Sequence, residues 1–468
     1  MIYYLAAVRR SSRLNLKFAL SSAGIIRPMR SRVMARRVSR ARAAWPLALL
    51  SLGALMLAVG LGGWWAYEDI PSVRFRVQTW WGQARDVIAP HPDIVPTPAG
   101  AAAAPALTFP SATPSPQPMA TATPLAASSD ITPPAAATLV VRTPTATPPS
   151  TVILTGFKHE YQLYNNCGPA SLAVNLSYWG WDGNQKIAAP VLKPNQDDKN
   201  VSPRELYEYL LTQGFDAYIR VNGDVDTLKR FIAAGYPVLV EKGFVCENTE
   251  RCKDWFGHYS VFAGYDDARR VFILQDTYRG PDIRLSYDEL ATHWRAFNFL
   301  YVVAFPAGAE RDAQVVSLLG PAADLDQNYR DALARAQYEA LTLTGQDAAF
   351  AWFNVGTNLS YLRDYAGAAA AYDQARRIGL PYRMLWYQFG PYRSYYQMAR
   401  YQDVIDLATF AIESANVPGL EEAYSWRGQA EETLGLRDQA IADYRETLKW
   451  HPGDEEAMKA LEALGETP

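Results

Sequence analysis

The chain has 468 residues, of which 49% are hydrophobic and 12% aromatic, which is enough material for two folded domains with shorter appendages. Its net charge of −3 hides an uneven distribution, because residues 1–42 contain eleven Lys or Arg and no acidic residue, which leaves the remainder with a net charge of −14. A basic terminus can bind nucleic acid. This one directly precedes an apolar run, so we expect a membrane and no nucleic acid as its partner.

The apolar run reads AAWPLALLSLGALMLAVGLGG over residues 43–63, and aromatic and then acidic residues follow it. About 20 apolar residues match the hydrocarbon thickness of a bilayer, and aromatic side chains favour its interface. The sequence therefore predicts a single transmembrane signal-anchor over residues 43–66, with a basic cytoplasmic tail at 1–42. A cleaved signal peptide is the alternative, but both its basic and its apolar regions are usually shorter.

Residues 67–151 are predicted to connect this anchor to the folded part of the chain. After a short juxtamembrane piece, the composition from about residue 90 to 150 falls to Pro, Ala, Thr and Ser. Such a segment buries too little apolar surface to offset its ordering entropy, and its prolines favour extended conformers. We expect a spacer that holds the following domains away from the membrane.

Residues 152–307 have the mixed periodicity of one α+β unit. Apolar residues recur with helical spacing in three segments, 169–178, 202–213 and 225–234. Four short segments rich in Val, Phe and Tyr are expected strands, namely 237–241, 258–265, 271–275 and 300–305. The Asp-Asp turn in GYDDARRVF predicts that the second and third strands form an antiparallel hairpin.

A cysteine stands at the start of the first expected helix, in YNNCGPASLAVNLSYWG. Pro169 suits the first helical turn, so Cys167 is expected at the helix N-terminus, where the dipole and unsatisfied amides lower a thiol pKa. Gly168 is expected to keep the approach to the sulfur open. A thiolate nucleophile also needs a neighbouring base and an oxyanion stabiliser.

Three further residues of the same unit have the side chains that this chemistry needs. His258 opens an expected strand, Asp276 ends the next one and can orient an imidazole, and Gln162 offers an amide five residues before the cysteine. Gln, Cys, His and Asp in this order make up a papain-type constellation.

The segments QLYNNCGPASLA, GHYSVFAGYDD and ILQDTYRGP resemble the papain-like cysteine peptidases related to the double-glycine leader peptidases of bacteriocin exporters. The resemblance covers about residues 152–307. It implies that Cys167 is the nucleophile, His258 the base, Asp276 the orienting acid and Gln162 the oxyanion donor. Each also has an ordinary interpretation: an inert buried thiol, a structural histidine, a strand-end aspartate and a surface glutamine. His159 is interpreted as a surface residue.

The two remaining cysteines, Cys246 and Cys252, lie close together in FVCENTERCKDWFGH. In an exported domain such a pair favours a disulfide, with free thiols or a zinc site that includes His258 as alternatives. No phosphate-binding Gly-rich loop or strong metal-ligand cluster is evident in the sequence. We therefore expect neither a cofactor nor a metal.

Residues 328–465 have a helical pattern with a repeat of 36 residues, at which Ala368, Val404 and Ala440 recur. Gly356 and Gly428 are separated by two such periods. Small residues at this spacing, with aromatic residues between them, indicate stacked helical hairpins.

The repeat resembles the tetratricopeptide pattern over about residues 348–454. The residues that carry the resemblance are Trp352, Gly356, Ala368, Tyr372, Ala375 and Pro381 in one unit, and Tyr424, Gly428, Ala440, Tyr444 and Pro452 in the last. The middle unit departs from the pattern, because Tyr392 stands where a small residue is expected. The resemblance implies an all-α solenoid that docks a protein or peptide partner.

These observations predict a membrane-anchored, extracytoplasmic cysteine peptidase of papain-like α+β fold, followed by a tetratricopeptide-like solenoid. The expected substrate is a peptide or protein. Two alternatives stay open: an amidase or acyl transferase that uses the same thiol on a non-peptide amide, and an inactive domain that only binds peptides.

Overall fold

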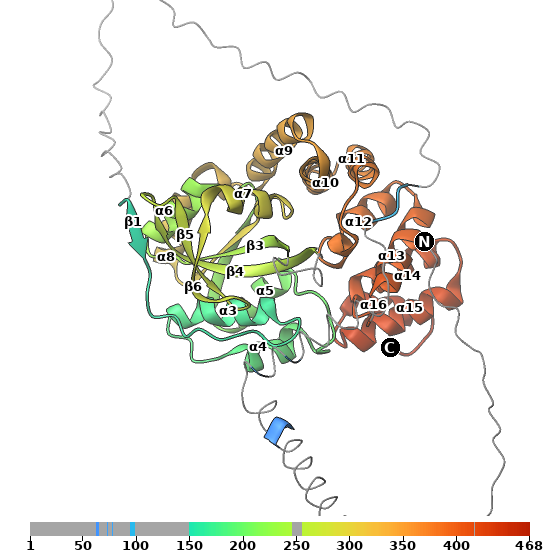
Figure 1. The fold of residues 1–468 in the computed structure, drawn as a ribbon. Coiled ribbons are helices and arrows are strands. Elements are labelled where there is room, and N and C mark those ends of the chain that lie inside the picture. The colour runs from blue at the N-terminus through green and yellow to red at the C-terminus, as the bar shows by residue number, and fades with distance from the viewer. Residues whose placement is uncertain are drawn as a thin grey trace, which may run out of the picture. The chain divides into compact units, whose positions relative to one another are not determined.

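The computed structural model describes residues 62–64, 73, 77, 94–98, 149–245, 255–415 and 417–468 (Figure 1). The chain divides into two compact units, residues 1–65 and 66–468, and the sheet with its surrounding helices belongs to the second. None of the helices in the described part of the chain has both the length and the apolar character needed to cross a membrane. The predicted signal-anchor at 43–66 lies almost entirely outside the described residues.

The first folded region of the second unit combines one antiparallel sheet with helices, as the α+β prediction required. Its strands are β1 (Thr151–Ile153), β2 (Phe215–Arg220), β3 (Val238–Val245), β4 (Trp255–Asp266), β5 (Val271–Asp276), β6 (Gly280–Ser286) and β7 (Tyr301–Pro306). Its helices are α3 (Cys167–Tyr178), α4 (Gln185–Leu192), α5 (Pro203–Thr212), α6 (Val225–Ala233) and α7 (Tyr287–Arg295).

The strands are ordered β2-β7-β3-β4-β5-β6, and β1 pairs separately with the end of β4. Strands β4 and β5 form the antiparallel hairpin expected from the Asp-Asp turn. All described pairings in the sheet are antiparallel. Strands β3 and β5 flank β4, so that the end of β3 lies beside the start of β4 at Trp255 and the end of β5 lies beside its middle at Val261.

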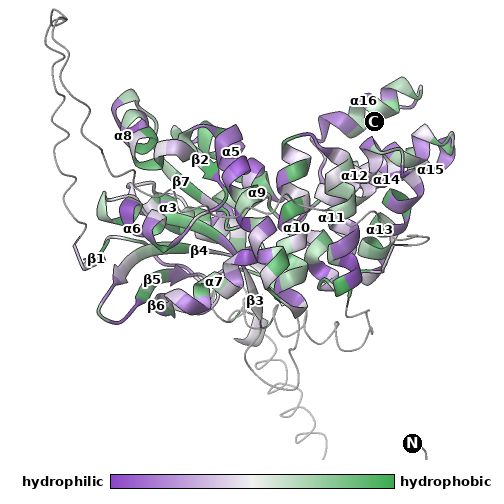
Figure 2. Cartoon of the chain, turned by 90° about the horizontal axis from the view of Figure 1, so that it is seen from above, coloured by the Kyte–Doolittle hydropathy of each residue, from purple (hydrophilic) through white to green (hydrophobic). Residues whose placement is uncertain are grey.

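Helices cover both faces of this sheet, and alternate strand residues point to opposite sides. Leu239 and Val302 pack with α3, α4 and α5 on one face. Val238 and Val303, each one residue away, pack with α6 and α7 on the other. Figure 2 shows the green of hydrophobic residues concentrated in strands such as β7. Burial on both faces explains why the central strands are nearly continuous apolar runs.

The seven elements expected from the sequence all exist, with ends that differ by a few residues. The largest differences are at β3 and β4, which extend to Val245 and begin at Trp255. The prediction missed β1, β2, β6, α4 and α7. Strand β6 (GPDIRLS) lies at the edge of the sheet and is largely polar, so it lacks the apolar signal on which strand prediction depends.

The remainder of the described chain is helical. Its helices are α8 (Ala309–Leu319), α9 (Leu325–Thr342), α10 (Gly345–Tyr361), α11 (Tyr365–Ile378), α12 (Gly390–Gln397), α13 (Tyr401–Ser414), α14 (Glu421–Thr433), α15 (Arg437–Trp450) and α16 (Glu455–Ala463), with short 3-10 helices η1 (Gly320–Ala323) and η2 (Tyr382–Trp386). From α9 onward, helices adjacent in sequence pack against each other.

Small and aromatic residues of the 36-residue repeat meet where paired helices cross. A Cβ atom at Gly356 would lie 2.7 Å from the ring of Tyr372, and one at Gly428 would lie 3.1 Å from the ring of Tyr444. Glycine therefore permits the close approach of α10 to α11 and of α14 to α15. The departure expected at Tyr392 coincides with α12, which has only 8 residues. Membership of the tetratricopeptide family stays a prediction.

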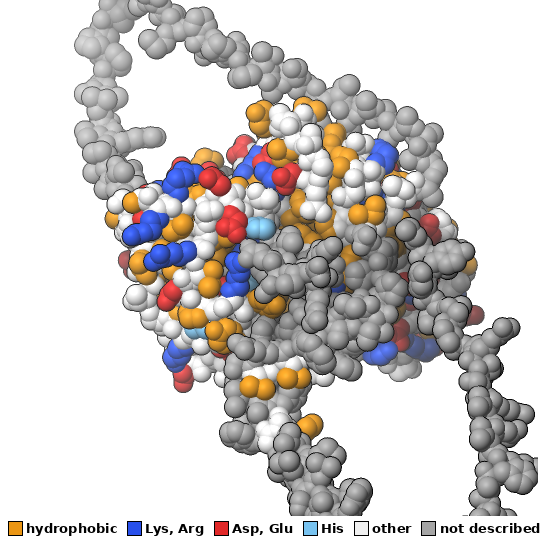
Figure 3. Space-filling view, in the orientation of Figure 1, with side chains coloured by type: hydrophobic (Ala, Val, Ile, Leu, Met, Phe, Trp, Pro, Cys, Tyr) orange, Lys and Arg blue, Asp and Glu red, His pale blue; other side chains and the backbone are white. Residues whose placement is uncertain are grey.

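The helical region packs directly on the α+β domain. Asn298 and Asn358 exchange side-chain hydrogen bonds of 2.6 and 3.3 Å, and Arg295 pairs with Glu339 at 3.1 Å. Trp255 stacks on neighbouring aromatic rings from both regions. Figure 3 shows acidic and basic side chains interspersed over the described part of one face of the molecule.

Candidate active site

Cys167 is the first residue of α3, as its position before Gly-Pro predicted. The cysteine is partly exposed, whereas the ten residues that follow it are buried. A Cβ atom at Gly168 would lie 3.0 Å from Cβ of Val201. Glycine at position 168 therefore allows α3 to pack closely against the chain before α5. Its expected role in keeping the approach to the sulfur open stays a prediction.

His258 on β4 and Asp276 at the end of β5 form a buried pair. His258 Nε2 lies 3.2 Å from Asp276 Oδ1, and the thiol of Cys167 interacts with the same imidazole. Since Nε2 faces the carboxylate, Nδ1 is the ring nitrogen left for the thiol. The hairpin β4–β5 and the start of α3 therefore bring together three residues that are distant in the sequence. His258 follows Cys167 by 91 positions, and Asp276 follows His258 by 18.

Asp276 is held by several donors. Its Oδ2 accepts a hydrogen bond of 2.9 Å from Ser260, and its Oδ1 accepts from the backbone amides of Tyr278 and Arg279 at 3.0 and 2.9 Å. Burial raises a carboxyl pKa, but His258, Lys242 and these amides outweigh it and hold the pKa of Asp276 far below its usual value. The carboxylate is ionised at neutral pH.

The thiol and the imidazole shift each other's ionisation. Burial raises the pKa of Cys167. This effect is outweighed by His258, through its hydrogen bond and its charge, and by the Tyr259 amide and Lys193, so that the net pKa of the thiol is lowered. Burial lowers the pKa of His258, but the charge and hydrogen bond of Asp276 outweigh it, so that pKa is raised. Together these shifts favour a thiolate–imidazolium pair.

Gln162 is buried, contrary to its interpretation as a surface residue. Its side-chain oxygen accepts a 2.9 Å hydrogen bond from Thr277, and its backbone amide donates to the Thr277 carbonyl at 2.9 Å. Ser171 of α3 lies 3.3 Å from the same Thr277 hydroxyl. Gln162 is therefore fixed to the residue that follows Asp276, with its amide nitrogen available as a donor.

Two polar residues near the thiol were missed by the sequence analysis. Lys193, just after α4, is buried and donates to the carbonyls of Asn165 and Gln196 at 2.9 and 3.2 Å. Glu241 on β3 is buried beside Tyr259, and burial raises its pKa well above the usual value. Neither residue belongs to a recognisable motif, and only the packing of α4 and β3 brings them close to Cys167.

The other candidates have mixed outcomes. His159 is partly buried, packs edge-on against Tyr161 and lines a cavity of about 380 Å³ beside β5 and β6, so its interpretation as a surface residue was incomplete. Cys246 and Cys252 lie outside the described residues, and their predicted disulfide stays a prediction.

The comparison with protein families points to the same domain. Residues 154–302 match the model of the Peptidase_C39-like family. The chain contains a Peptidase_C39-like domain. This match agrees in extent with residues 152–307, over which the sequence resembles the double-glycine peptidases. No curated protein matches the chain.

Solved structures similar to the chain include three peptidases. A C39-like peptidase from Bacillus anthracis shares 16% identity, with a TM-score of 0.28, over 34% of this chain and 99% of that chain. The peptidase domain of Streptococcus ComA, a bifunctional ABC transporter, shares 19% identity, with a TM-score of 0.25, over 33% and 100%. A double-glycine-motif protease from an AMS/PCAT transporter, in complex with its leader peptide, shares 16% identity, with a TM-score of 0.25, over 34% and 99%.

Proposed function

We propose that this protein is a cysteine peptidase that hydrolyses peptide bonds through Cys167, His258 and Asp276, with Gln162 as oxyanion donor. The observation that carries the proposal is the thiol at the start of α3, beside an imidazole whose Nε2 faces a buried, ionised carboxylate 3.2 Å away. The match to the Peptidase_C39-like family supports a peptide as substrate.

In this mechanism the Cys167 thiolate attacks the carbonyl carbon of the scissile bond, and the Gln162 amide donates to the developing oxyanion. His258, as imidazolium, gives its proton to the leaving amine as the C–N bond breaks, which leaves a thioester. Neutral His258 then takes a proton from water, whose oxygen attacks the thioester. Collapse of this second intermediate releases the carboxylic acid and leaves the Cys167 thiolate beside the imidazolium that formed when His258 took the proton.

The test incubates the purified full-length protein with a peptide library, with and without prior treatment with a thiol alkylator. We expect cleavage in the untreated sample and none after alkylation of Cys167. Cleavage that persists after complete alkylation would remove the proposal. Hydrolysis of simple amides or acyl transfer in place of peptide cleavage would favour an amidase or transferase, and peptide binding without turnover would favour an inactive binding domain.

The proposed location is the outer side of a cell membrane, with residues 43–66 as an uncleaved anchor. Its support is the arginine-rich segment 1–42 followed by the apolar run. A reporter fused after Gly156 is expected outside the cell and in the membrane fraction. Recovery of a soluble fusion that lacks its N-terminus would identify a cleaved signal peptide instead.

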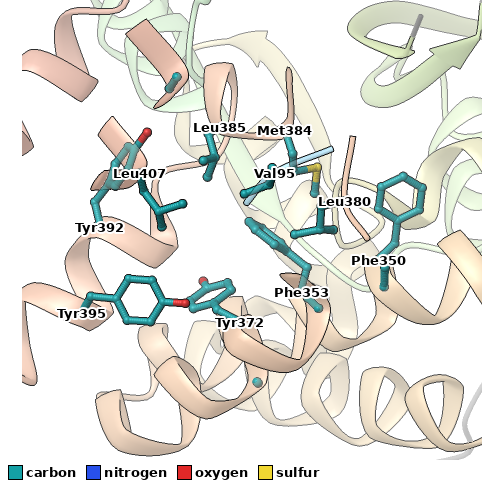
Figure 4. Close-up of a cluster of buried hydrophobic side chains, with 14 of the residues drawn as sticks. Val95, Phe350, Phe353, Tyr372, Leu380, Met384, Leu385, Tyr392, Tyr395 and Leu407 are labelled. Atoms are coloured by element: carbon teal, nitrogen blue, oxygen red, sulfur yellow. The ribbon is translucent and has the colours of Figure 1, made fainter. Parts of the chain in front are cut away.

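The proposed role of the helical region is to dock a peptide. A segment of the chain itself, residues 94–98, supports this role because it lies extended against the helical region. Val95 is fully buried, its backbone amide donates to the Leu380 carbonyl at 3.0 Å, and the Arg376 side chain donates to the Pro96 carbonyl at 2.8 Å. Figure 4 shows Val95 among labelled side chains that include Leu380, Met384 and Leu385.

The position of this segment coincides with the irregular middle unit, where η2 and the short α12 replace a regular helix. The contacts combine one buried aliphatic side chain with backbone hydrogen bonds, which is a way to recognise a short extended peptide. We therefore assign the site a preference for an aliphatic residue followed by proline.

Val95→Asp in the full-length protein is expected to release the segment and to let a synthetic Asp-Ile-Val-Pro-Thr-Pro peptide bind, as measured by fluorescence anisotropy. Ile94→Asp is the matched control, because Ile94 is half-exposed and its replacement leaves the buried contact intact. Equal peptide binding by the wild type and the two variants would contradict the assignment.

A further inference from the structure

A group of acidic side chains lies where the Peptidase_C39-like domain meets the end of the helical region. Backbone hydrogen bonding connects the two regions here. Asp198 and Gly419 form an isolated parallel β-bridge, and the Lys199 amide donates to the Gly419 carbonyl at 3.0 Å. Glu205 is in the first turn of α5, and Glu421 begins α14. The residues at this junction come from distant parts of the sequence.

The charges at this junction do not balance. Asp198 and Glu421 are buried, and Glu205 and Glu422 are mostly buried beside them. Two ammonium groups act on them: the buried Lys193, which is hydrogen bonded to two backbone carbonyls, and the partly buried Lys199. Four neighbouring carboxylates in a dry environment need protons or a cation, because burying unpaired charge is costly.

One of these carboxylates is short of partners. Glu421 is only 3% exposed, and its Oε2 has no hydrogen-bond partner among the described residues. Oε2 of the adjacent Glu422 is likewise buried and unpartnered in that part of the chain. A native structure rarely leaves buried carboxylate oxygens unsatisfied, so these atoms point to a ligand.

The side chains of Glu205, Glu421 and His451 have the arrangement of metal ligands. Each offers one ligand atom, and the three atoms lie within 4.8 Å of one another. Glu205 Oε2 accepts from the Ser202 amide at 2.7 Å, while its Oε1 lies 3.8 Å from Nδ1 of His451. Two ligands of one tetrahedral zinc ion lie about 3.4 Å apart, so small side-chain movements suffice.

We propose that Glu205, Glu421 and His451 bind a zinc ion that fastens the helical region to the Peptidase_C39-like domain. One imidazole with two carboxylates suits zinc, whereas calcium and magnesium prefer a shell of oxygen atoms alone. Glu422 is not one of the three grouped ligands, so a water molecule would complete the tetrahedral shell. The proposed site is structural. It departs from the expectation that the protein has no metal, and the metal-binding test below decides between them.

The competing explanation is that the carboxylates are simply protonated. Burial raises the pKa of Glu421 and Glu422 well above the usual value, which is consistent with shared protons. A protonated cluster and a zinc site differ in one measurable respect. Only the zinc site binds one equivalent of metal and is stabilised by it.

The test uses the full-length protein in a mild detergent, without a histidine tag and freed of metal with a chelator. Addition of ZnCl₂ is expected to give one bound zinc per chain by elemental analysis and a higher thermal-unfolding temperature. Cobalt should substitute for zinc and give visible absorption bands typical of a tetrahedral site. Glu421→Gln and His451→Ala should each weaken zinc binding at least about tenfold.

Two controls make the outcome specific. His293→Ala should keep full zinc binding, because His293 also lies near a glutamate, Glu289 at 3.9 Å, but belongs to no group of three possible metal ligands among the described residues. A double Cys246→Ser, Cys252→Ser variant should keep it as well. The proposal is overturned if the wild type binds no zinc, or if Glu421→Gln and His451→Ala bind it as the wild type does. Loss of zinc only in the cysteine variant would also overturn it.

Discussion

Two clusters in this protein place a histidine beside buried carboxylates, and they satisfy those carboxylates in different ways. Asp276 accepts hydrogen bonds from Ser260 and two backbone amides, and it lies beside His258. Glu421, near His451, has an oxygen without a partner in the described chain. Burial raises the pKa of both carboxyls, yet the pKa of Asp276 is lowered and that of Glu421 is raised.

The difference teaches that burial alone does not decide the ionisation of a carboxylate. The hydrogen-bond donors and cations around Asp276 stabilise its carboxylate more than burial destabilises it. Asp276 can therefore stay ionised beside an imidazolium without any added ligand. Around Glu421 the described residues leave one carboxylate oxygen without a donor, and we propose that a metal completes the cluster. The first arrangement suits a reaction site, and the second suits a binding site. Substitutions in and around the first cluster test this interpretation.

The largest effect is expected from Cys167→Ala. Without the sulfur there is no nucleophile, so peptide hydrolysis should fall at least about 10⁴-fold. Cys167→Ser should come close, because an alkoxide is far harder to form than a thiolate. Turnover of a cleaved library peptide measures both, with circular dichroism as the folding control. Wild-type turnover in Cys167→Ala would show that Cys167 is not the nucleophile and would remove the proposed mechanism.

His258→Ala should be nearly as severe, with a loss of about 10³- to 10⁴-fold in kcat, because it removes the base and proton donor. The matched control is His293→Ala, which removes a histidine near a carboxylate outside the active site and should leave kcat within about twofold. Comparable losses in the two variants would mean that the effect of His258→Ala is only structural.

Asp276→Ala should lower kcat by about 10- to 1,000-fold, since an orienting residue is less essential than the nucleophile. It also removes the acceptor of the Ser260 hydroxyl, so some loss of stability is expected. Asp288→Asn is the control, because Asp288 is an exposed carboxylate paired with Arg270. An unchanged kcat in Asp276→Ala would show that His258 needs no orienting partner.

Gln162→Ala should lower kcat about 100-fold with little change in KM, if its amide donates to the oxyanion. A purely structural role would instead reduce the thermal-unfolding temperature and leave kcat nearly unchanged. Gln374→Ala, on α11, is the control for removal of a glutamine side chain. Full-length protein and the same peptide serve for all of these measurements.

The smallest effect is a shift along the pH axis. The pKa of Cys167 is lowered and that of His258 is raised, so the thiolate–imidazolium pair exists at pH values between these two pKa values. The alkylation rate of Cys167 should therefore reach half of its maximum at a pH below the free-thiol pKa of about 8.5. In His258→Ala the midpoint should move upward, because burial then acts with less opposition. Labelling at Cys167, followed by mass spectrometry, gives the rate. A wild-type midpoint at or above the free-thiol value would contradict the lowered pKa.

Much of the candidate active site could be predicted because its signals are local. Cys167 precedes Gly-Pro at a helix start, and Asp276 ends β5, across a hairpin turn from the strand that contains His258. His258 does not open that strand as expected, because β4 begins three residues earlier, at Trp255. Each feature depends on a few neighbouring residues, whose backbone preferences act over short range. The same holds for Gly356 and Gly428, where a period of 36 residues predicted helix crossings.

The sequence by itself thus predicted seven elements of the α+β domain, the hairpin, the helical repeat and the candidate residues for thiol chemistry. Tertiary structure alone decided the donors to Asp276, the burial of Gln162, the docking of Val95 and the meeting of Glu205, Glu421 and His451. The reason is physical: side-chain periodicity reports which face of an element is buried, but not which distant element covers it. Charges on separate elements become neighbours only when packing brings those elements together and removes the water between them.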